Sequence, residues 1–338
     1  MPLDLHRLDP FDDDAVDAWW EAYAAAERAD RGAGATVWTR DETRSELQQE
    51  SAVVDRRAYL IRDAGAVLGS ASLALPLKDN TGIAHLGLSV PPAHRRRGVG
   101  TRALALLEHE ARSAGRTTTQ ASTSWPHDLG PDGTGSPGRE FARRHGYALA
   151  LGDVMSRLDL PVDESALRGH EAAAAASGRA YEMRSWVGGV PDEVIEQWAI
   201  LDASLETEAP TGEKEIEAQT PDVDSIRESD ALIARQRRLS FGTIALAPDG
   251  TAAAYSQLVV STDGNAYQWG TLVRTADRGH RLGLAVKIAN LRMLQSTAPE
   301  VRSAYTHNAE SNSHMLAVNA LLGFRPVERL GELQKHLD

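Results

Sequence analysis

One stretch of the sequence reads Val90-Pro-Pro-Ala-His-Arg-Arg-Arg-Gly-Val-Gly-Thr101, and a second reads Val273-Arg-Thr-Ala-Asp-Arg-Gly-His-Arg-Leu-Gly-Leu284. When the two stretches are aligned residue by residue, identical residues recur at matching positions: Val90 and Val273, Ala93 and Ala276, Arg95 and Arg278, Gly100 and Gly283. A β-like segment precedes each stretch, and a run rich in alanine and leucine follows it. This ordered series of matches indicates a tandem duplication.

The rest of each half supports the duplication. In both halves the hydrophobic pattern predicts the order strand, helix, helix, three strands, helix, strand, helix, strand. The turn sequences Asp63-Ala-Gly65 and Pro248-Asp-Gly250 separate two of these strands, as in β-hairpins. For a chain of 338 residues we therefore expect two domains, residues 1–160 and 179–338, joined by a helical or loosely ordered linker at 161–178.

The composition limits the possible functions. A formal net charge of −12 disfavours nucleic acid as a partner and permits a cationic one. The absence of cysteine excludes disulfides, thiolate zinc sites and a cysteine nucleophile. No apolar run is long enough to span a bilayer, no secretory signal is visible, and no histidine or carboxylate spacing suggests a metal site. We expect a cytoplasmic protein that binds no membrane, metal or nucleic acid.

The turn between the strand and the helix can bind an anion. Its glycines, Gly98 and Gly100, let a ligand approach the backbone, and the unpaired N–H groups at the start of the helix converge on one point. The helix dipole and the arginines Arg95, Arg96 and Arg97 add positive charge. A phosphate or pyrophosphate is the natural ligand of such a turn. The alternative is a tight turn with a purely structural role, which two copies in matched contexts disfavour.

The segment Arg95-Arg-Arg-Gly-Val-Gly100, with the order of elements around it, resembles the GNAT superfamily of acyl-CoA-dependent N-acyltransferases, whose signature is Gln/Arg-x-x-Gly-x-Gly/Ala. Residues 308–324 also resemble the end of a GNAT domain. The resemblance covers nearly the whole chain as two copies, and this tandem form is similar to actinobacterial mycothiol-synthase-like proteins. It implies a mixed α/β (α+β) fold of two GNAT-like domains, each with a splayed, mostly antiparallel sheet flanked by helices.

The resemblance also implies where acetyl-CoA binds as co-substrate. In each copy the turn holds the pyrophosphate, and the splayed strands beside it hold the pantetheine arm. Arg281 stands in the second copy where the first signature glycine is expected. The residues implied in cofactor binding are Leu88, Ser89, Val90, Arg95, Arg96, Arg97, Gly98, Val99, Gly100, Thr101, Leu272, Val273, Arg278, Gly279, His280, Arg281, Leu282, Gly283, Asn308 and Asn312.

The catalytic residues are harder to assign. In the family an amine attacks the thioester directly within a ternary complex, with a general base for the ammonium and a tyrosine as proton donor to the thiolate. Ala142 and Asn319 stand at the two tyrosine positions. His85, on the strand before the first turn, and His307, at the end of a later strand, are the candidate bases. For both histidines a structural role is the alternative.

Two classes of function follow. The first is an N-acetyltransferase that uses acetyl-CoA to modify the primary amine of a small molecule, with one domain degenerate. The second is a non-catalytic acyl-CoA-binding or regulatory protein, which the missing tyrosines favour. Either protein is expected to be a monomer or a homodimer.

Overall fold

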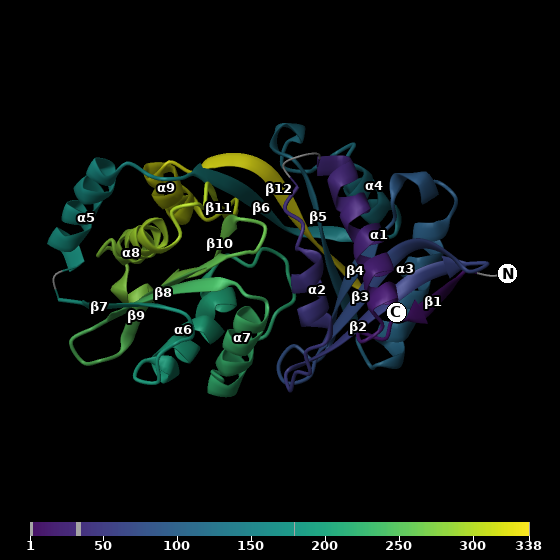
Figure 1. Ribbon diagram of the computed structural model, residues 1–338, viewed down its shortest axis with the longest axis horizontal. Coiled ribbons are helices and arrows are strands. Elements are labelled where there is room, and N and C mark those ends of the chain that lie inside the picture. The colour runs from purple at the N-terminus through teal and green to yellow at the C-terminus, as the bar shows by residue number, and fades with distance from the viewer. Residues whose placement is uncertain (1–2, 32–34, 179, 338) are drawn as a thin grey trace. The chain divides into compact units, whose positions relative to one another are not determined.

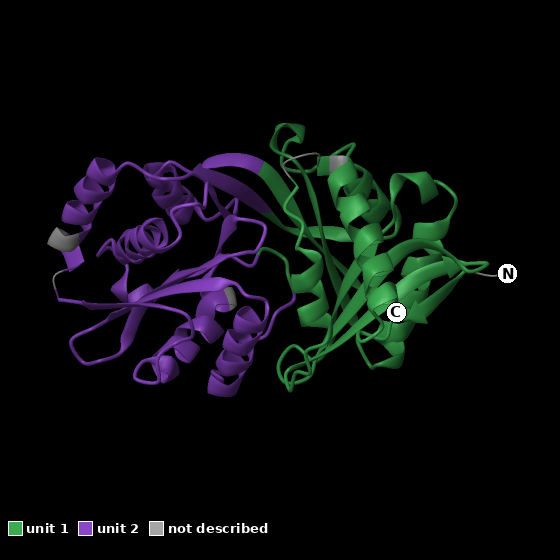
Figure 2. Ribbon diagram, viewed as in Figure 1, with its two compact units in different colours: residues 1–152, 212–214, 328–338 green, residues 153–211, 215–327 purple. Residues whose placement is uncertain are grey.

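The computed structural model describes residues 3–31, 35–178 and 180–337 and divides into two compact units (Figures 1 and 2). Unit 1 comprises residues 1–152, 212–214 and 328–338, and unit 2 comprises residues 153–211 and 215–327. Residue 179, at which the second domain is expected to begin, lies outside the described residues.

The sheet of unit 1 has the strand order β1-β2-β3-β4-β5-β12. Neighbouring strands are antiparallel except β4 and β5, which are parallel. The elements along the chain are β1 (Asp4–Arg7), α1 (Asp13–Arg31), α2 (Arg40–Leu47), β2 (Val54–Asp63), β3 (Ala66–Pro76), β4 (Ile83–Ser89), α3 (Val99–Ser113), β5 (Thr118–Pro126), α4 (Pro137–Arg144), β6 (Ala148–Asp159) and, from the far end of the chain, β12 (Arg325–His336).

Alternation along β2 explains why helices cover both faces of this sheet. Ala58 and Leu60 are buried against Val16 of α1, whereas Tyr59 and Ile61 are buried in the cluster that contains Leu107 of α3. Successive strand residues point to opposite faces, so a run of consecutive apolar residues such as 58–61 needs a cover on each side. α2 packs on the α1 face, and α4 on the α3 face.

Unit 2 repeats this plan with the strand order β6-β11-β10-β9-β8-β7. The helices α6 and α7 share one buried cluster, and α8 and α9 share another with α5. The elements are α5 (Glu164–Gly178), β7 (Glu182–Val187), α6 (Ile195–Glu208), α7 (Val223–Arg235), β8 (Leu239–Leu246), β9 (Ala252–Val260), β10 (Asn265–Val273), α8 (Leu282–Thr297), β11 (Ser303–Ala309) and α9 (Ser313–Leu322). The expected fold class, two mixed and mostly antiparallel sheets with flanking helices, is confirmed.

The compact units differ from the expected boundaries because the final strands are exchanged. In unit 1, β5 pairs with β12, the last strand of the chain, from Pro126 opposite Glu328 to Thr118 opposite His336. In unit 2, β11 pairs with residues 153–159 of β6. The order of elements along the chain is as expected, and the pairing of the final strands is a further feature that the element order does not define. The two final strands have similar residue patterns, so the pattern of one strand does not reveal the exchange.

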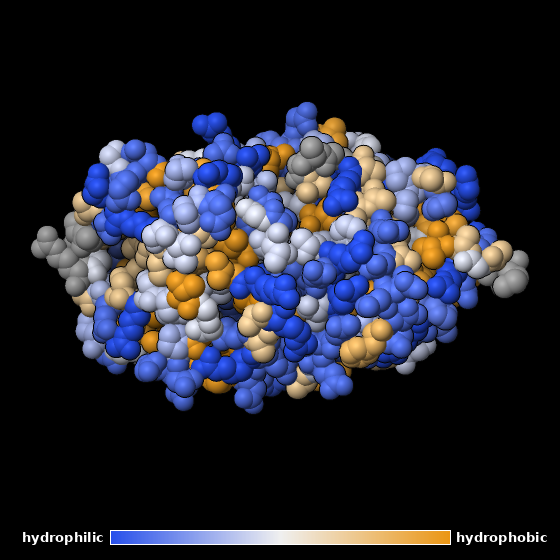
Figure 3. Space-filling model, viewed as in Figure 1, coloured by the Kyte–Doolittle hydropathy of each residue, from blue (hydrophilic) through white to orange (hydrophobic). Residues whose placement is uncertain are grey.

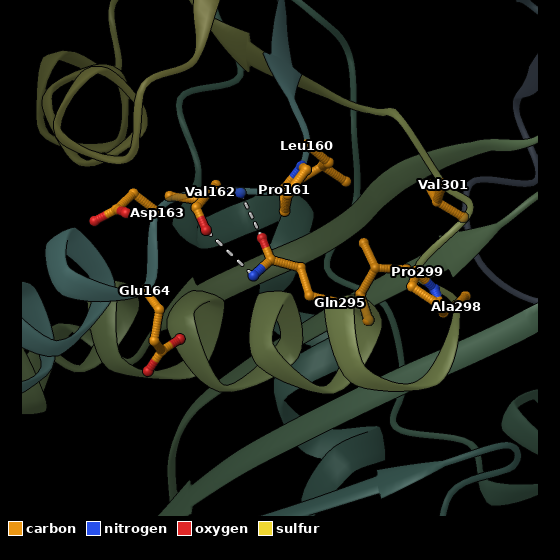
Figure 4. Close-up of a pocket in the computed structure, with 10 residues that line it drawn as sticks. Leu160, Pro161, Val162, Asp163, Glu164, Gln295, Ala298, Pro299 and Val301 are labelled. Carbon is orange, nitrogen blue, oxygen red and sulfur yellow. Dashed lines mark hydrogen bonds between the residues drawn. The ribbon is translucent and has the colours of Figure 1, made fainter.

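The segment expected as a linker is a packed helix. Leu167 of α5 is fully buried in the cluster that also contains Leu291 of α8. Just before α5, the side chain of Gln295 holds the backbone of Val162, accepting from its N–H at 2.6 Å and donating to its carbonyl at 3.3 Å (Figure 4). A cavity of about 580 Å³ opens beside this contact. Of the two alternatives for residues 161–178, the structure supports the helical one.

The pairing of β5 with β12 can be tested with an engineered disulfide, because the chain has no cysteine of its own. Ser122 of β5 lies directly opposite Glu332 of β12. Opposed residues in antiparallel strands have Cα atoms about 4.5–5.5 Å apart, which suits a disulfide. The double variant Ser122→Cys with Glu332→Cys should form an intramolecular disulfide on mild oxidation, found as a cross-linked peptide by mass spectrometry of the monomer.

Each single-cysteine variant is the control and should give no intramolecular cross-link. A double variant that forms only disulfide-linked dimers, or none, would contradict the pairing of β5 with β12.

Candidate active site

The two parallel strands of unit 1 separate. β4 and β5 are paired only from Ile83 opposite Thr118 to His85 opposite Gln120. Beyond this point β4 continues to Ser89 and β5 continues to Pro126, each paired on its outer edge only. Their inner edges therefore present backbone N–H and C=O groups without strand partners, and such groups bind a ligand or water.

A cavity of about 1150 Å³ occupies this part of unit 1. The ends of β4 and β5 line it together with α1, α3, α4 and β12. Among the residues expected from sequence to bind the cofactor, those that line the cavity are Leu88, Ser89, Val90, Arg95, Arg96, Gly98, Val99, Gly100 and Thr101. Arg97 is exposed and is not among the lining residues.

The turn before α3 is held open by unusual backbone angles. Arg96 and Gly98 both have left-handed conformations, with φ of 61° and 76°. Arg95 anchors the turn, because its Nε donates to the carbonyl of Val90 at 2.8 Å and its Nη2 donates to the carbonyl of Ala26 at 3.5 Å. Gly98 is the N-cap of α3 and provides no side chain to cap it. The first residues of α3 thus line the cavity without a side-chain cap, an arrangement whose N–H groups can bind an anion.

Gly100 is required by close packing. A Cβ atom at this position would lie 3.1 Å from Cε2 of Phe141. Phe141 of α4 lines the same cavity, so the glycine lets the first turn of α3 approach α4 beside the ligand space. A larger residue must displace Phe141.

The second copy reproduces the turn with the residue types reversed. Gly279 and Arg281 have φ of 90° and 56°, matching the left-handed pair Arg96 and Gly98. Arg278 donates to the carbonyls of Val273 at 3.4 Å and of Glu208 at 3.3 Å, as Arg95 does in unit 1. The departure from the family signature at Arg281 therefore leaves the backbone geometry intact, at a steric cost of about 1–2 kcal/mol for a non-glycine residue.

Deeper in the sheet the two copies differ. Lys287 occupies the position in α8 that Leu104, which lines the cavity, occupies in α3. Lys287 is 2% exposed, and its Nζ donates to Oδ1 of Asn319 at 2.7 Å. Asn319 in turn donates to Oδ1 of Asn308 at 2.6 Å. Burial lowers the pKa of Lys287 to about 7.

The other site residues predicted from the sequence lie in different parts of the two units. His85 and His307 are both exposed, and His85 is not among the residues that line the cavity of unit 1. Asn312 caps α9, accepting from the N–H of Met315 at 3.2 Å. Asn308 belongs to the Lys287 network. Leu272 and Val273 end β10, and His280, Leu282 and Gly283 continue the second turn into α8.

Among the described residues that line the cavity of unit 1, no tyrosine replaces the proton donor that the family resemblance implies. Tyr147 lines the cavity, but its hydroxyl donates to Glu108 at 3.2 Å and lies 3.0 Å from Oγ1 of Thr119. Burial, with the Glu108 carboxylate, raises the pKa of Tyr147. A hydroxyl engaged in this way is a poor acid for a thiolate. Ala142, at the family's tyrosine position, lines the cavity without a polar group.

Sequence reasoning missed several lining residues. Glu27 and Arg31 lie on α1, Phe141 and Arg144 on α4, and Leu330 on β12. The helical residues stand outside any motif, and their amphipathic pattern indicates only that one face is buried. Leu330 could not be assigned to this cavity without knowledge of the strand exchange.

Other kinds of site are not found in the described part of the chain. Within it, no group of three or more histidine, aspartate or glutamate side chains is placed to hold a metal ion. None of the described helices is long and apolar enough to cross a membrane. Hydrophilic residues cover most of the face shown in Figure 3.

The buried Lys287 makes the stability of the protein depend on pH. Its pKa is about 7 when folded and 10.5 when unfolded, so between these values the unfolded chain holds a proton that the folded chain lacks. The free energy of unfolding should therefore rise with pH across this window, by up to about 1.4 kcal/mol per pH unit.

Urea unfolding of the wild type and of Lys287→Met, measured at several pH values, checks this. The difference between the two proteins cancels other titrating groups and should change along the window, because the variant lacks the group. A difference that stays constant with pH would show that Lys287 does not titrate with a lowered pKa.

Comparison with known proteins agrees with this architecture. Residues 15–124 match the acetyltransferase (GNAT) family. A tandem GNAT protein from the clavulanic acid biosynthesis pathway, solved without AcCoA, is 27% identical with a TM-score of 0.77, and the match covers 99% of this chain and 98% of that one. No curated protein matches the sequence.

Two more distant structures share the fold. A GCN5-related N-acetyltransferase from Sphaerobacter thermophilus is 16% identical, with a TM-score of 0.62 over 99% of this chain and 95% of that one. A glucosamine N-acetyltransferase region of a fungal multi-domain β-N-acetylglucosaminidase is 15% identical, with a TM-score of 0.64 over 98% and 38% of the two chains. The finer similarity to mycothiol-synthase-like proteins stays a prediction. The chain has the fold of a tandem GNAT protein, and these similarities support acyl transfer as its general activity.

Proposed function

We propose that unit 1 transfers an acetyl group from acetyl-CoA to the primary amine of a small molecule. The observation that carries the proposal is the separation of β4 from β5 beside a turn that presents unpaired N–H groups to one cavity. The similar tandem GNAT protein of the clavulanic acid pathway is described with reference to AcCoA, which supports acetyl-CoA as the donor to test.

Successive parts of the cavity lining suit successive parts of the acetyl-CoA molecule. The N–H groups at the start of α3 suit the pyrophosphate, and Arg96 and Arg144 add positive charge to the lining. The unpaired inner edges of β4 at 88–89 and of β5 at 122–124 suit the pantetheine arm, whose amides need backbone partners. The thioester then lies between the two strands.

The chemistry is a direct transfer. The amine nitrogen attacks the thioester carbon, so the C–N bond forms as the C–S bond breaks, and CoA leaves as a thiolate that takes up a proton. With no cysteine in the chain, an acyl-cysteine intermediate is excluded. An unpaired N–H on the inner edge of β4 would stabilise the negative charge that develops on the carbonyl oxygen. Holding both reactants in one cavity, close together and correctly oriented, increases the rate further.

Proton transfer is proposed to run through water. His85 stands at the last paired position before β4 and β5 separate, and this place supports it as a base that acts through a bridging water. In unit 2, His307 lies on the second of the two parallel strands, one residue past the last pairing of β11 with β10 at Thr306. The leaving thiolate would also be protonated by water, because Ala142 offers no donor.

Unit 2 is proposed to be the degenerate copy. Lys287 and Asn319 place a buried polar network where unit 1 has Leu104 and Ala142 lining its cavity. A polar group at this position opposes the burial of an acyl chain. The retained turn geometry at 278–283 is consistent with a common origin of the two copies.

Matched glycine variants test which unit is catalytic. Gly100→Val should displace Phe141 and lower both acetyl-CoA affinity and thiol release by roughly tenfold or more, which corresponds to a loss of about 1.4 kcal/mol. Gly283→Val makes the same change in unit 2, where the added Cβ meets Cγ2 of Val273 at 3.3 Å, and should leave turnover within about threefold.

The measurements are thiol release with a panel of amines and calorimetric titration with acetyl-CoA, with circular dichroism to confirm folding of both variants. Loss of turnover in Gly283→Val alone would assign catalysis to unit 2. Binding of acetyl-CoA without turnover of any amine would favour the alternative function, a non-catalytic acyl-CoA-binding protein.

A further inference from the structure

The deep end of the cavity in unit 1 reaches the hydrophobic core. β4 and β5 are last paired at His85 and Gln120. The next residues, Leu86 and Ala121, line the cavity where the strands part. Leu333 of β12 lies directly opposite Ala121 and lines the cavity as well. Three neighbouring strands therefore contribute one apolar side chain each to this end of the cavity, on the face that α3 covers.

The other walls of the deep end are also apolar. Leu104 of α3, Ala142 of α4 and Tyr147, which follows α4, line the cavity and are only 5–6% exposed. They belong to the same buried cluster as the leucines of β4 and β12. The apolar end of the cavity is thus formed by six residues from separate elements: Leu86, Leu104, Ala121, Ala142, Tyr147 and Leu333.

The polar atoms next to this end are already paired. The hydroxyl of Tyr147 donates to Glu108 at 3.2 Å and lies 3.0 Å from Oγ1 of Thr119. Lys335 donates to the same carboxylate at 2.7 Å. Tyr147 therefore contributes its ring rather than a free hydroxyl. The side chains of the apolar end offer a ligand apolar contacts, so a polar group placed there would lose its hydrogen bonds to water.

The apolar end lies beyond the groups that suit the pantetheine arm. The unpaired inner edges at 88–89 and 122–124 are farther from the last strand pair than Leu86 and Ala121 are. A donor with its pyrophosphate at the turn before α3 and its amides along these edges brings its thioester toward the point where the strands meet. The acyl group continues past the thioester carbon and enters the apolar end.

Ala142 leaves room at this point. It stands where the family resemblance implies a tyrosine, and the cavity extends to it. A methyl group in place of a phenol ring leaves space beside the acyl group, and the small side chain of Ala121 adds to that space. Unit 2 differs, because Asn319 holds the position of Ala142 and accepts a hydrogen bond from Lys287 at 2.7 Å.

We infer that unit 1 also accepts donors whose acyl group is longer than acetyl, such as propionyl-CoA and butyryl-CoA, and that the apolar end binds their extra methylene groups. This inference rests on the proposed acetyltransferase function of unit 1. The transfer is the same: the amine nitrogen bonds to the acyl carbon, the C–S bond breaks, and the proton that the amine loses passes through water to the CoA thiolate. Ala142 is then a specificity-determining residue, because its size limits the acyl group.

Calorimetric titration with acetyl-CoA, propionyl-CoA and butyryl-CoA tests the inference without turnover. A buried methylene group contributes about 0.8 kcal/mol, so the affinity of the wild type should rise about fourfold with each added carbon, or roughly fifteenfold from acetyl-CoA to butyryl-CoA. Equal affinities for the three donors, or weaker binding of butyryl-CoA, would overturn the inference.

Two variants on opposite walls locate the extra carbons. Ala142→Leu fills the space and should remove most of the preference for butyryl-CoA over acetyl-CoA. Ala121→Val narrows the same space from β5 and should lower the preference too, which decides the question if Ala142→Leu does not fold.

Ala105→Leu is the matched control, because it adds the same side chain at an exposed position of α3 that is not among the lining residues. It should keep the wild-type preference. A preference that persists in both cavity variants, or that falls equally in Ala105→Leu, would show that the apolar end does not bind the extra carbons.

Thiol release with the amine panel separates this inference from the proposed function. Tighter binding of butyryl-CoA that depends on Ala142, without transfer to any amine, supports the apolar end as an acyl site and rejects the proposed function. Transfer from acetyl-CoA without tighter binding of butyryl-CoA supports the proposed function and rejects this inference. Failure of all three donors to bind rejects both.

Discussion

The parting of two parallel strands is the feature on which the rest of this protein depends. β4 and β5 share only their first residues, and each then relies on one outer neighbour, β3 for β4 and β12 for β5. A strand that is paired along one edge stays ordered while its other edge remains available to a ligand. The full-length pairing with β12 therefore preserves the cavity, and the last strand of the chain is as necessary to it as the signature turn.

The duplicated architecture could be read from the sequence because its signals are local. The repeated turn, the element order and the hairpin turns each involve neighbouring residues, and all appear in the structure. The strand exchange could not be read from the sequence, because β6 and β12 carry similar residue patterns and each pairs with a strand far away along the chain. For the same reason Glu328 and Leu330 were not expected near the cavity. Glu27 and Arg31 lie outside any motif, and only the folded structure shows that they line the cavity.

The two copies share one backbone arrangement at the turn but differ in the side chains beneath it. Their turns keep the same left-handed positions and the same arginine anchor, although glycine and arginine have changed places. Beneath the turn, unit 1 keeps Leu104 and an accessible cavity, whereas unit 2 buries Lys287 on Asn319. Burying the Lys287 amine opposes stability, and its hydrogen bond to Asn319 offsets only part of that cost.

Amide hydrogen exchange with and without acetyl-CoA tests the central claim most directly, because it reports on both turns in one sample. The account predicts slower exchange at residues 96–101 and along the inner edges of β4 and β5 when acetyl-CoA is present, since those N–H groups then have partners. It predicts little change at residues 279–284. Slower exchange confined to residues 279–284, with none in unit 1, would contradict the account.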